Sequence, residues 1–240
     1  MKAFGSIIMG ARTGAGAIMA RVVERHVSIV AVGNWNPSIF HPEWVRRNKA
    51  IGKDESTEAL EKGVVVTPDL CQWSFGSMHV QVFRNRFSVR CTEDPLVRAK
   101  DFAGVCFQKL SHTPVTAMGI NNTLIVETES EAHWRKFGDK LAPQSNWSDL
   151  FGAPKARNGG LVSMLMVSND RPDKRPGFIQ VKVDSVPSLR ISFEVNDHFQ
   201  VVGEDGSSSA GDLQEMLESE WVKCSRRSSK IVEGLRHLDE

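Results

Sequence analysis

Carboxylate and imidazole side chains lie next to each other at one place in the sequence that could do acid/base chemistry. Asp197 and His198 directly follow an alternating apolar segment, so both would leave a strand together. His112 precedes Thr113-Pro114 at the expected end of a helix, where it could serve as a general base. Simpler roles are favoured, because an Asn-Asp pair is expected to end a strand in a turn and a histidine at a helix C-terminus complements the helix dipole. His112, Asp197 and His198 are therefore weak catalytic candidates.

Other motifs that bind metals, nucleotides or substrates are missing from the sequence. None of the seven histidines has a second histidine three or four residues on, so no helix would present two imidazoles to one metal ion. The glycines at 10, 14 and 16 lack the Gly-Lys-Ser/Thr of a phosphate loop, and no Gly-x-Ser-x-Gly elbow is present. The four cysteines form no Cys-x-x-Cys pair and are expected to be buried and reduced. We predict no cofactor and no metal site, and a non-catalytic protein is favoured over an enzyme.

The composition is that of an ordinary folded protein. Of the 240 residues, 40% are hydrophobic and 25% are charged, and the formal net charge is only +1. This charge gives no overall field that would attract a polyanion or a membrane surface. No apolar run approaches the roughly 20 residues that cross a bilayer. We predict a cytoplasmic protein without a membrane partner, and nucleic acid is disfavoured.

Apolar residues recur with the two-residue period of strands in several segments. Alternation at 78–83 and 87–91 around Arg84-Asn85 predicts a hairpin, and 189–195 alternates with one face buried and one exposed. Further strands are expected at 27–32, 161–167 and 178–183, with an interrupted extended segment over 115–127. The connection 169–176 carries arginine, lysine and proline and is expected to be mobile. These segments together predict an antiparallel sheet of hairpins or a meander.

Helical patterns alternate with these strands. Short helices are expected near 42–45 and 55–62, a longer one opens at Asp94-Pro95, and Thr128 with Glu131 forms a capping box for another. The final helix follows Ser209 and Asp212 and carries an apolar stripe along about 26 residues, or roughly 39 Å. We expect this helix to lie across the sheet, with a helical dimer seam as the alternative. The predicted fold class is therefore α+β, an antiparallel sheet packed against helices.

The chain is expected to divide into a leader and one domain. Glycine-rich residues 1–24 predict a flexible leader or a misassigned start, with Met19 in place of Met1 as the true first residue. Residues 25–240 form a single α+β domain, and two subdomains meeting near 155–160 are the alternative.

Short phrases spread over 27–238 resemble an uncharacterised family of bacterial proteins of about 220–250 residues, with no assigned activity. The resemblance implies a bacterial cytoplasmic setting and carries no activity, since its motifs are tryptophans, turns and caps. The residues that carry it are Asn36-Pro37, Ile39-Phe40, His112-Thr113-Pro114-Val115, Gly119-Ile120-Asn121, Trp134, Gly138-Asp139, Leu141-Ala142-Pro143, Trp147 and Asn196-Asp197-His198-Phe199.

Aromatic residues provide the leading functional hypothesis, a non-catalytic protein that binds a protein partner or self-assembles. Trp35, Phe40 and Trp44 lie beside a proline-rich turn and are expected to be exposed, and Trp221 lies on the final helix. The alternative is a small-molecule-binding protein or a hydrolase with a pocket between the sheet and that helix. A weaker alternative is a nucleic-acid accessory factor that uses the basic pairs at 46–47, 174–175 and 226–227.

Overall fold

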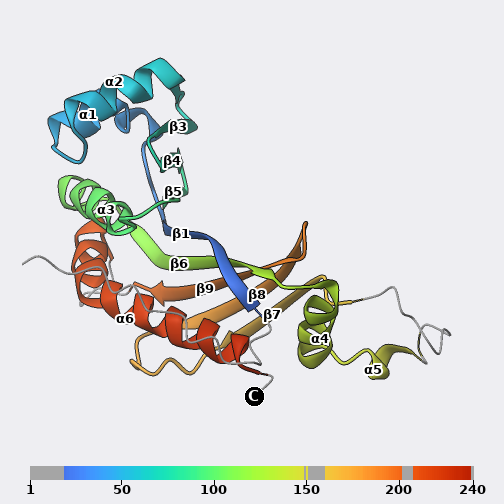
Figure 1. Ribbon diagram of the computed structural model, residues 1–240. Coiled ribbons are helices and arrows are strands. Elements are labelled where there is room, and N and C mark those ends of the chain that lie inside the picture. The colour runs from blue at the N-terminus through green and yellow to red at the C-terminus, as the bar shows by residue number, and fades with distance from the viewer. Residues whose placement is uncertain (1–18, 149, 151–159, 202–207, 239–240) are drawn as a thin grey trace, which may run out of the picture.

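Nine strands form one antiparallel sheet in the order β2-β3-β4-β5-β1-β6-β9-β8-β7 (Figure 1). The computed structural model describes residues 19–148, 150, 160–201 and 208–238. The strands are β1 Met19–Gly33, β2 Val65–Val66, β3 Leu70–Phe75, β4 Met78–Phe83, β5 Arg86–Cys91, β6 Val115–Thr128, β7 Ser163–Ser168, β8 Gly177–Val186 and β9 Arg190–Gln200. The predicted α+β class is confirmed.

Helices pack on this sheet, and the longest one lies along it. The helices are η1 Pro37–Ile39, α1 Pro42–Arg47, α2 Lys53–Lys62, α3 Val97–Lys109, α4 Glu131–Leu141, α5 Ser145–Ser148 and α6 Ala210–Arg236. Helix α6 contacts α3, β6 and β9, which confirms the predicted docking of the C-terminal helix on the sheet (Figure 1). Its predicted cap is also present, because Asp212 accepts hydrogen bonds from the Ser209 amide (2.8 Å) and hydroxyl (3.0 Å).

Buried side chains form two clusters that share the sheet and α6. The first cluster lies around β1, β3, β4, β5 and α3, and includes Leu213 and Leu217 of α6. The second lies around β8, β9 and α4, and includes Val232 near the other end of α6. Because one helix contributes to both clusters, it fixes their relative position. The predicted subdomain boundary near 155–160 falls almost wholly among residues 151–159, outside the described part of the chain.

The central strands β1 and β6 are longer than predicted. The segment from Met19 to Glu24 pairs with β6, with Arg21 opposite Glu127, so β1 begins eight residues before the strand predicted at 27–32. The leader or misassigned start predicted for 1–24 stays a prediction. Strand β6 continues through Gly119, where an interruption was expected. A side chain at Gly119 would place its first carbon 3.0 Å from Asn196 Oδ1 on β9, so the glycine leaves room for the Asn196 side chain. Residues 1–18, including the glycine cluster, are outside the described part.

Two predicted helix starts are wrong. Thr128 is the last residue of β6, and its hydroxyl donates to the Leu189 carbonyl at 2.8 Å, so it is not available as a cap. Ser130 caps α4 instead and accepts a hydrogen bond from the His133 amide. Helix α3 begins at Val97, later than Asp94-Pro95 predicted.

None of the helices within the described residues is long and apolar enough to cross a membrane.

Candidate functional site

Asp197 lies inside strand β9 and is fully buried, so the predicted strand end at Asn196-Asp197 is wrong. Strand β9 continues to Gln200, and every second residue points into the interior. Asp197 occupies this inward phase after Phe193 and Val195, and its side chain is 0% exposed. A buried carboxylate needs partners that offset the loss of hydration. The neighbouring segments supply them as two arginines.

Arg171 reaches Asp197 from the connection between β7 and β8. Its guanidinium lies 3.2 Å from Asp197 and forms two hydrogen bonds, of 2.9 and 2.6 Å, with the carboxylate of Asp173. It also donates to the backbone carbonyls of Phe178 (3.0 Å) and His198 (3.2 Å). The guanidinium carbon lies 4.0 Å from the centre of the Phe199 ring. The Arg171 side chain is therefore fully enclosed, with charged, dipolar and aromatic partners.

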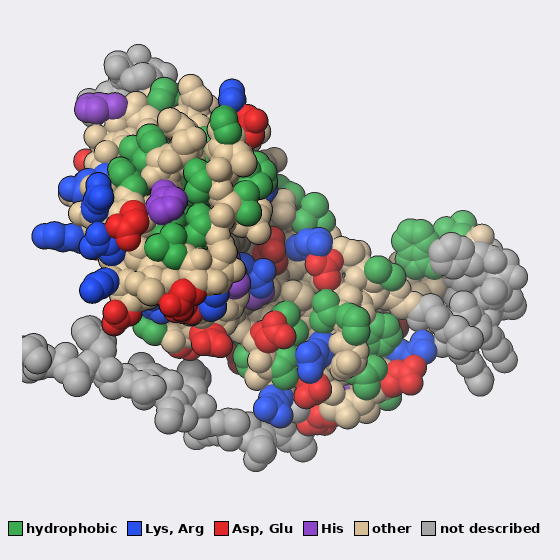
Figure 2. Space-filling view, turned by 90° about the horizontal axis from the view of Figure 1, so that it is seen from above, with side chains coloured by type: hydrophobic (Ala, Val, Ile, Leu, Met, Phe, Trp, Pro, Cys, Tyr) green, Lys and Arg blue, Asp and Glu red, His purple; other side chains and the backbone are tan. Residues whose placement is uncertain are grey.

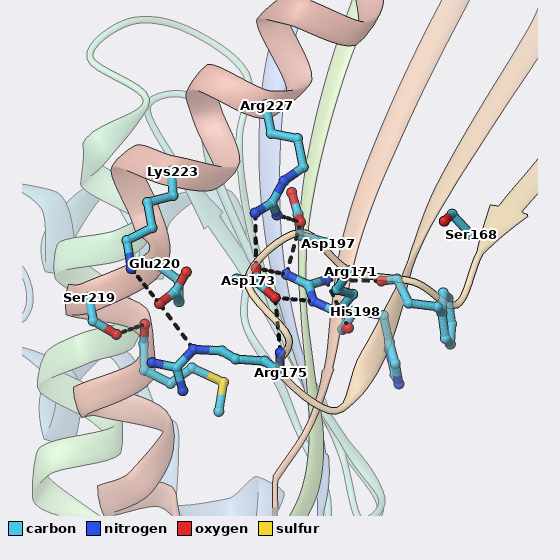
Figure 3. Close-up of polar contacts among 12 residues, drawn as sticks. Ser168, Arg171, Asp173, Arg175, Asp197, His198, Ser219, Glu220, Lys223 and Arg227 are labelled. Atoms are coloured by element: carbon cyan, nitrogen blue, oxygen red, sulfur yellow. Dashed lines mark hydrogen bonds and ion pairs between the residues drawn. The ribbon is translucent and has the colours of Figure 1, made fainter.

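Helix α6 completes what we call the buried ion cluster, made of Arg171, Asp173, Asp197 and Arg227 (Figure 3). Arg227 donates to Asp197 and, at 2.9 Å, to Asp173. Two positive and two negative side chains thus come together from the 169–176 connection, β9 and α6. The charges balance, which offsets part of the cost of removing these ions from water.

A second contact holds the same connection on α6. Glu220 is fully buried and accepts hydrogen bonds from Arg175 at 3.1 Å and from Lys223 at 2.9 Å (Figure 3). Arg175 belongs to the connection, so the segment is tied to α6 at two places. The 169–176 connection was predicted to be mobile, but its ion pairs hold it against the helix.

The electrostatic environment shifts several pKa values near the cluster. Burial tends to raise the pKa of Asp173, but hydrogen bonds from Arg171 and the Arg175 amide, together with the charges of Arg171 and Arg227, lower it to about 2. Burial raises the pKa of the Cys224 thiol well above its ordinary value, so the thiol stays protonated. Burial and the charge of Arg171 lower the pKa of His198. Asp173 therefore stays ionised at neutral pH, and the cluster offers no thiolate.

The catalytic candidates are not brought together. His198 follows Asp197 on a strand and therefore points to the opposite face, where it stacks on Phe178 with ring centres 4.3 Å apart. His112 is exposed in the turn after α3 and does not take part in the ion pairs of the cluster. Within the described part of the chain, no group of three or more His, Cys, Asp or Glu residues is placed to hold a metal ion. The cluster is an arrangement of mutually paired charges, which fits a structural role.

The aromatic residues expected on the surface lie largely in the core. Trp35 is 3% exposed and Phe40 is 0% exposed, and both rings lie 5.5 Å from that of Phe87. Their predicted exposure is wrong, because the chain after β1 folds back and both rings pack against Phe87 of β5 in the core. Trp44 and Trp221 are partly buried against the same core. A role for any of the four in partner binding stays a prediction.

A run of consecutive exposed apolar residues that the sequence did not single out lies on β7. Leu165, Met166 and Val167 are 54%, 58% and 49% exposed, and Val162 just before the strand is 76% exposed. The sequence predicted a strand here but not its place at the edge of the sheet. The absence of any charge from Ser163 to Ser168 was the only signal available.

The opposite edge of the sheet is built differently. Strand β2 has only two residues, Val65 and Val66, and Pro68 follows two residues later. Short edge strands and nearby proline are the usual means by which sheets avoid pairing with other chains. Strand β7 has six residues, no proline and no charge, and no strand among the described residues pairs with its outer side. The two edges therefore differ in their capacity to accept another strand.

A hollow of about 520 Å³ lies on the surface beside α4, lined by Trp134, Arg135, Leu161, Val162 and Ser185 among others. It is not the pocket predicted between the sheet and the C-terminal helix, where α6 instead buries Leu217, Glu220 and Cys224.

Comparison with known proteins adds no relative. A scan of protein-family models finds none that matches this chain. A search of curated proteins finds no significant match either. The resemblance to a bacterial family therefore stays a prediction.

Removing Asp197 should strongly destabilise the fold. In Asp197→Ala the guanidiniums of Arg171 and Arg227 lose a buried counter-charge, and we expect the free energy of unfolding to fall by about 3–5 kcal/mol. The matched control is Asp69→Ala, which removes an exposed partner of Arg84 and should change stability by less than about 1 kcal/mol. Urea unfolding followed by circular dichroism measures both. Equal effects of the two substitutions would contradict the structural role of the cluster.

The low pKa of Asp173 makes stability depend on acid pH. Its pKa in the folded state is about 2, below the ordinary value of 3.8, so the carboxylate stabilises the fold above about pH 4 and this contribution is lost as the pH falls towards 2. In Asp173→Asn the loss of stability over that interval should be smaller than in the wild type. Urea titrations at several pH values between about 5 and 2 provide the comparison. Parallel curves for the two proteins would rule out this source of pH dependence.

Proposed function

We propose that the protein is a non-catalytic binding protein that associates with another polypeptide by strand addition at β7. The observation that carries this proposal is the uncharged, apolar and exposed edge strand Ser163–Ser168. An exposed edge of this kind presents unpaired backbone groups to a partner strand, and its side chains add apolar contact on both faces. The occupant we propose is an extended polypeptide segment with uncharged apolar side chains.

The buried ion cluster supports this role, because it holds the chain that follows β7. Strand β7 ends at Ser168, and Arg171 enters the interior three residues later. The start of β8 is held by the same side chain through the Phe178 carbonyl. An edge strand fixed at its end loses little conformational entropy when it pairs, which favours binding.

The basic side chains near α1 give weaker support to the nucleic-acid alternative. Figure 2 shows Lys and Arg side chains gathered at the left, at the end of the molecule formed by α1 and α2, with Asp and Glu side chains among them. Arg46 pairs with Glu43 at 2.9 Å, and Lys62 pairs with Glu58 at 2.6 Å. Paired charges contribute less to a phosphate-binding surface than free ones.

A charge placed on β7 should abolish the association. The change is Leu165→Lys, and the matched control is Leu60→Lys on α2, since the two leucines are 54% and 44% exposed. Each protein is isolated without denaturation from the cells that make it and weighed by native mass spectrometry. We expect the wild type and Leu60→Lys to carry an additional polypeptide above 26.7 kDa and Leu165→Lys to be free of it.

Two results would contradict the proposal. One is a wild-type protein that carries no second polypeptide, and the other is an association that Leu165→Lys leaves unchanged. Circular dichroism of each variant confirms that the fold is retained, which is expected because both leucines are exposed.

A further inference from the structure

The hydrogen-bonding groups along β7 alternate between β8 and the free edge. The Ser185 amide donates to the Val162 carbonyl at 2.9 Å, which makes these two residues a hydrogen-bonded pair of the antiparallel ladder. In such a ladder every second residue points its amide and carbonyl to the same neighbour. The backbone groups that face away from β8 are therefore those of Ser163, Leu165 and Val167.

We propose that the strand added at β7 is β7 of a second copy of the chain, antiparallel and centred on Leu165. This inference rests on the proposed function and names its partner. A two-fold axis perpendicular to the sheet keeps each face of one copy continuous with the same face of the other. Leu165 then lies opposite its own equivalent, and Ser163 lies opposite Val167 of the other copy.

This register uses every outward-facing group of the strand. The pairs formed by residues 163, 165 and 167 are the hydrogen-bonded ones, and each exchanges two bonds, so about six backbone hydrogen bonds form. A register centred on Met166 shifts Ser163 opposite a residue beyond the end of the strand and uses fewer of these groups. The backbone of β7 therefore favours the centre at Leu165.

The side chains of β7 are compatible with its own copy. A two-fold interface places each residue opposite a residue of the same short segment, so any charge there would meet a like charge nearby. Strand β7 carries none, since its sequence is Ser-Met-Leu-Met-Val-Ser. In the proposed register Met164 lies opposite Met166 of the other copy on the helix-covered face, and Leu165 meets Leu165 on the other face. Pairing would join two nine-stranded sheets into one.

Single cysteines on β7 test the register directly. In the Leu165→Cys dimer the two Cα atoms would lie about 5.5 Å apart, within the range of about 4.4–6.8 Å that a disulfide spans. The matched control is Val167→Cys, whose two copies would lie about 13 Å apart along the strands. The four native cysteines are all buried, so they do not compete. The double variant Ser163→Cys with Val167→Cys brings two pairs of thiols together.

Each full-length cysteine variant is oxidised mildly in a glutathione buffer, and its disulfide-linked dimer is measured by non-reducing electrophoresis. Sedimentation velocity measures the oligomeric state of the wild type. We expect the wild type to sediment as a dimer. We expect Leu165→Cys and the double variant to form an intermolecular disulfide, and the disulfide-linked fraction of Val167→Cys to be at least about tenfold smaller. A monomeric wild type, or Val167→Cys that links as well as Leu165→Cys, would overturn the inference. If the wild type instead carries a different polypeptide and Leu165→Lys does not, strand addition at β7 is supported and the inference that the partner is a second copy is wrong. If no polypeptide is bound at all, both proposals fail.

Discussion

The burial of Arg171 is the constraint on which the arrangement of the C-terminal half depends. A guanidinium removed from water is costly unless charge and hydrogen-bond partners surround it. Here the partners come from its own connection, from β9 and from the backbone of β8, and Arg227 of α6 shares the same two carboxylates. The interaction is satisfied only when β8, β9, the connection and α6 are all in place.

The contacts of the 169–176 connection determine how strand β7 is held at the edge of the sheet. Because the 169–176 connection is tied to β9 through Arg171 and to α6 through Asp173 and Arg175, strand β7 is held at one end as the last strand of the sheet. The same helix packs on the first core cluster through Leu213 and Leu217. The free edge is therefore part of a single framework, and its apolar residues are presented in a fixed orientation. A partner strand would pair with an edge that is already ordered.

Much of the fold could be predicted from local sequence patterns. Periodicity and capping chemistry predicted the hairpin of β4 and β5, helix α6 with its Ser209 cap, and the α+β class. Local patterns also gave wrong predictions. Thr128 and Glu131 have the spacing of a capping box, but Thr128 is the last residue of strand β6. The burial of Trp35 and Phe40 depends on how the chain folds back over β5, which no local pattern contains.

The candidate site was beyond local prediction for the same reason. Asp197 and Arg171 are 26 residues apart in sequence, and Asp197 and Arg227 are 30 apart. Their pairing depends on which strands are neighbours and on which face α6 covers. Strand order also decides that β7 is an edge strand, since an apolar segment of six residues fits a buried strand equally well. The sequence indicated a strand at this position, and only the sheet topology shows that it is exposed.

The most direct test of this account is hydrogen exchange in Arg171→Met, measured by mass spectrometry at a temperature where the variant is still folded. The amides of Met164 and Met166 face β8, so their exchange reports on the β7–β8 pairing. The account predicts that they exchange at least about tenfold faster than in the wild type, while amides of β4 and β5 change little. Unchanged protection of Met164 and Met166 in the folded variant would show that the buried ion cluster does not hold β7, and would contradict the account.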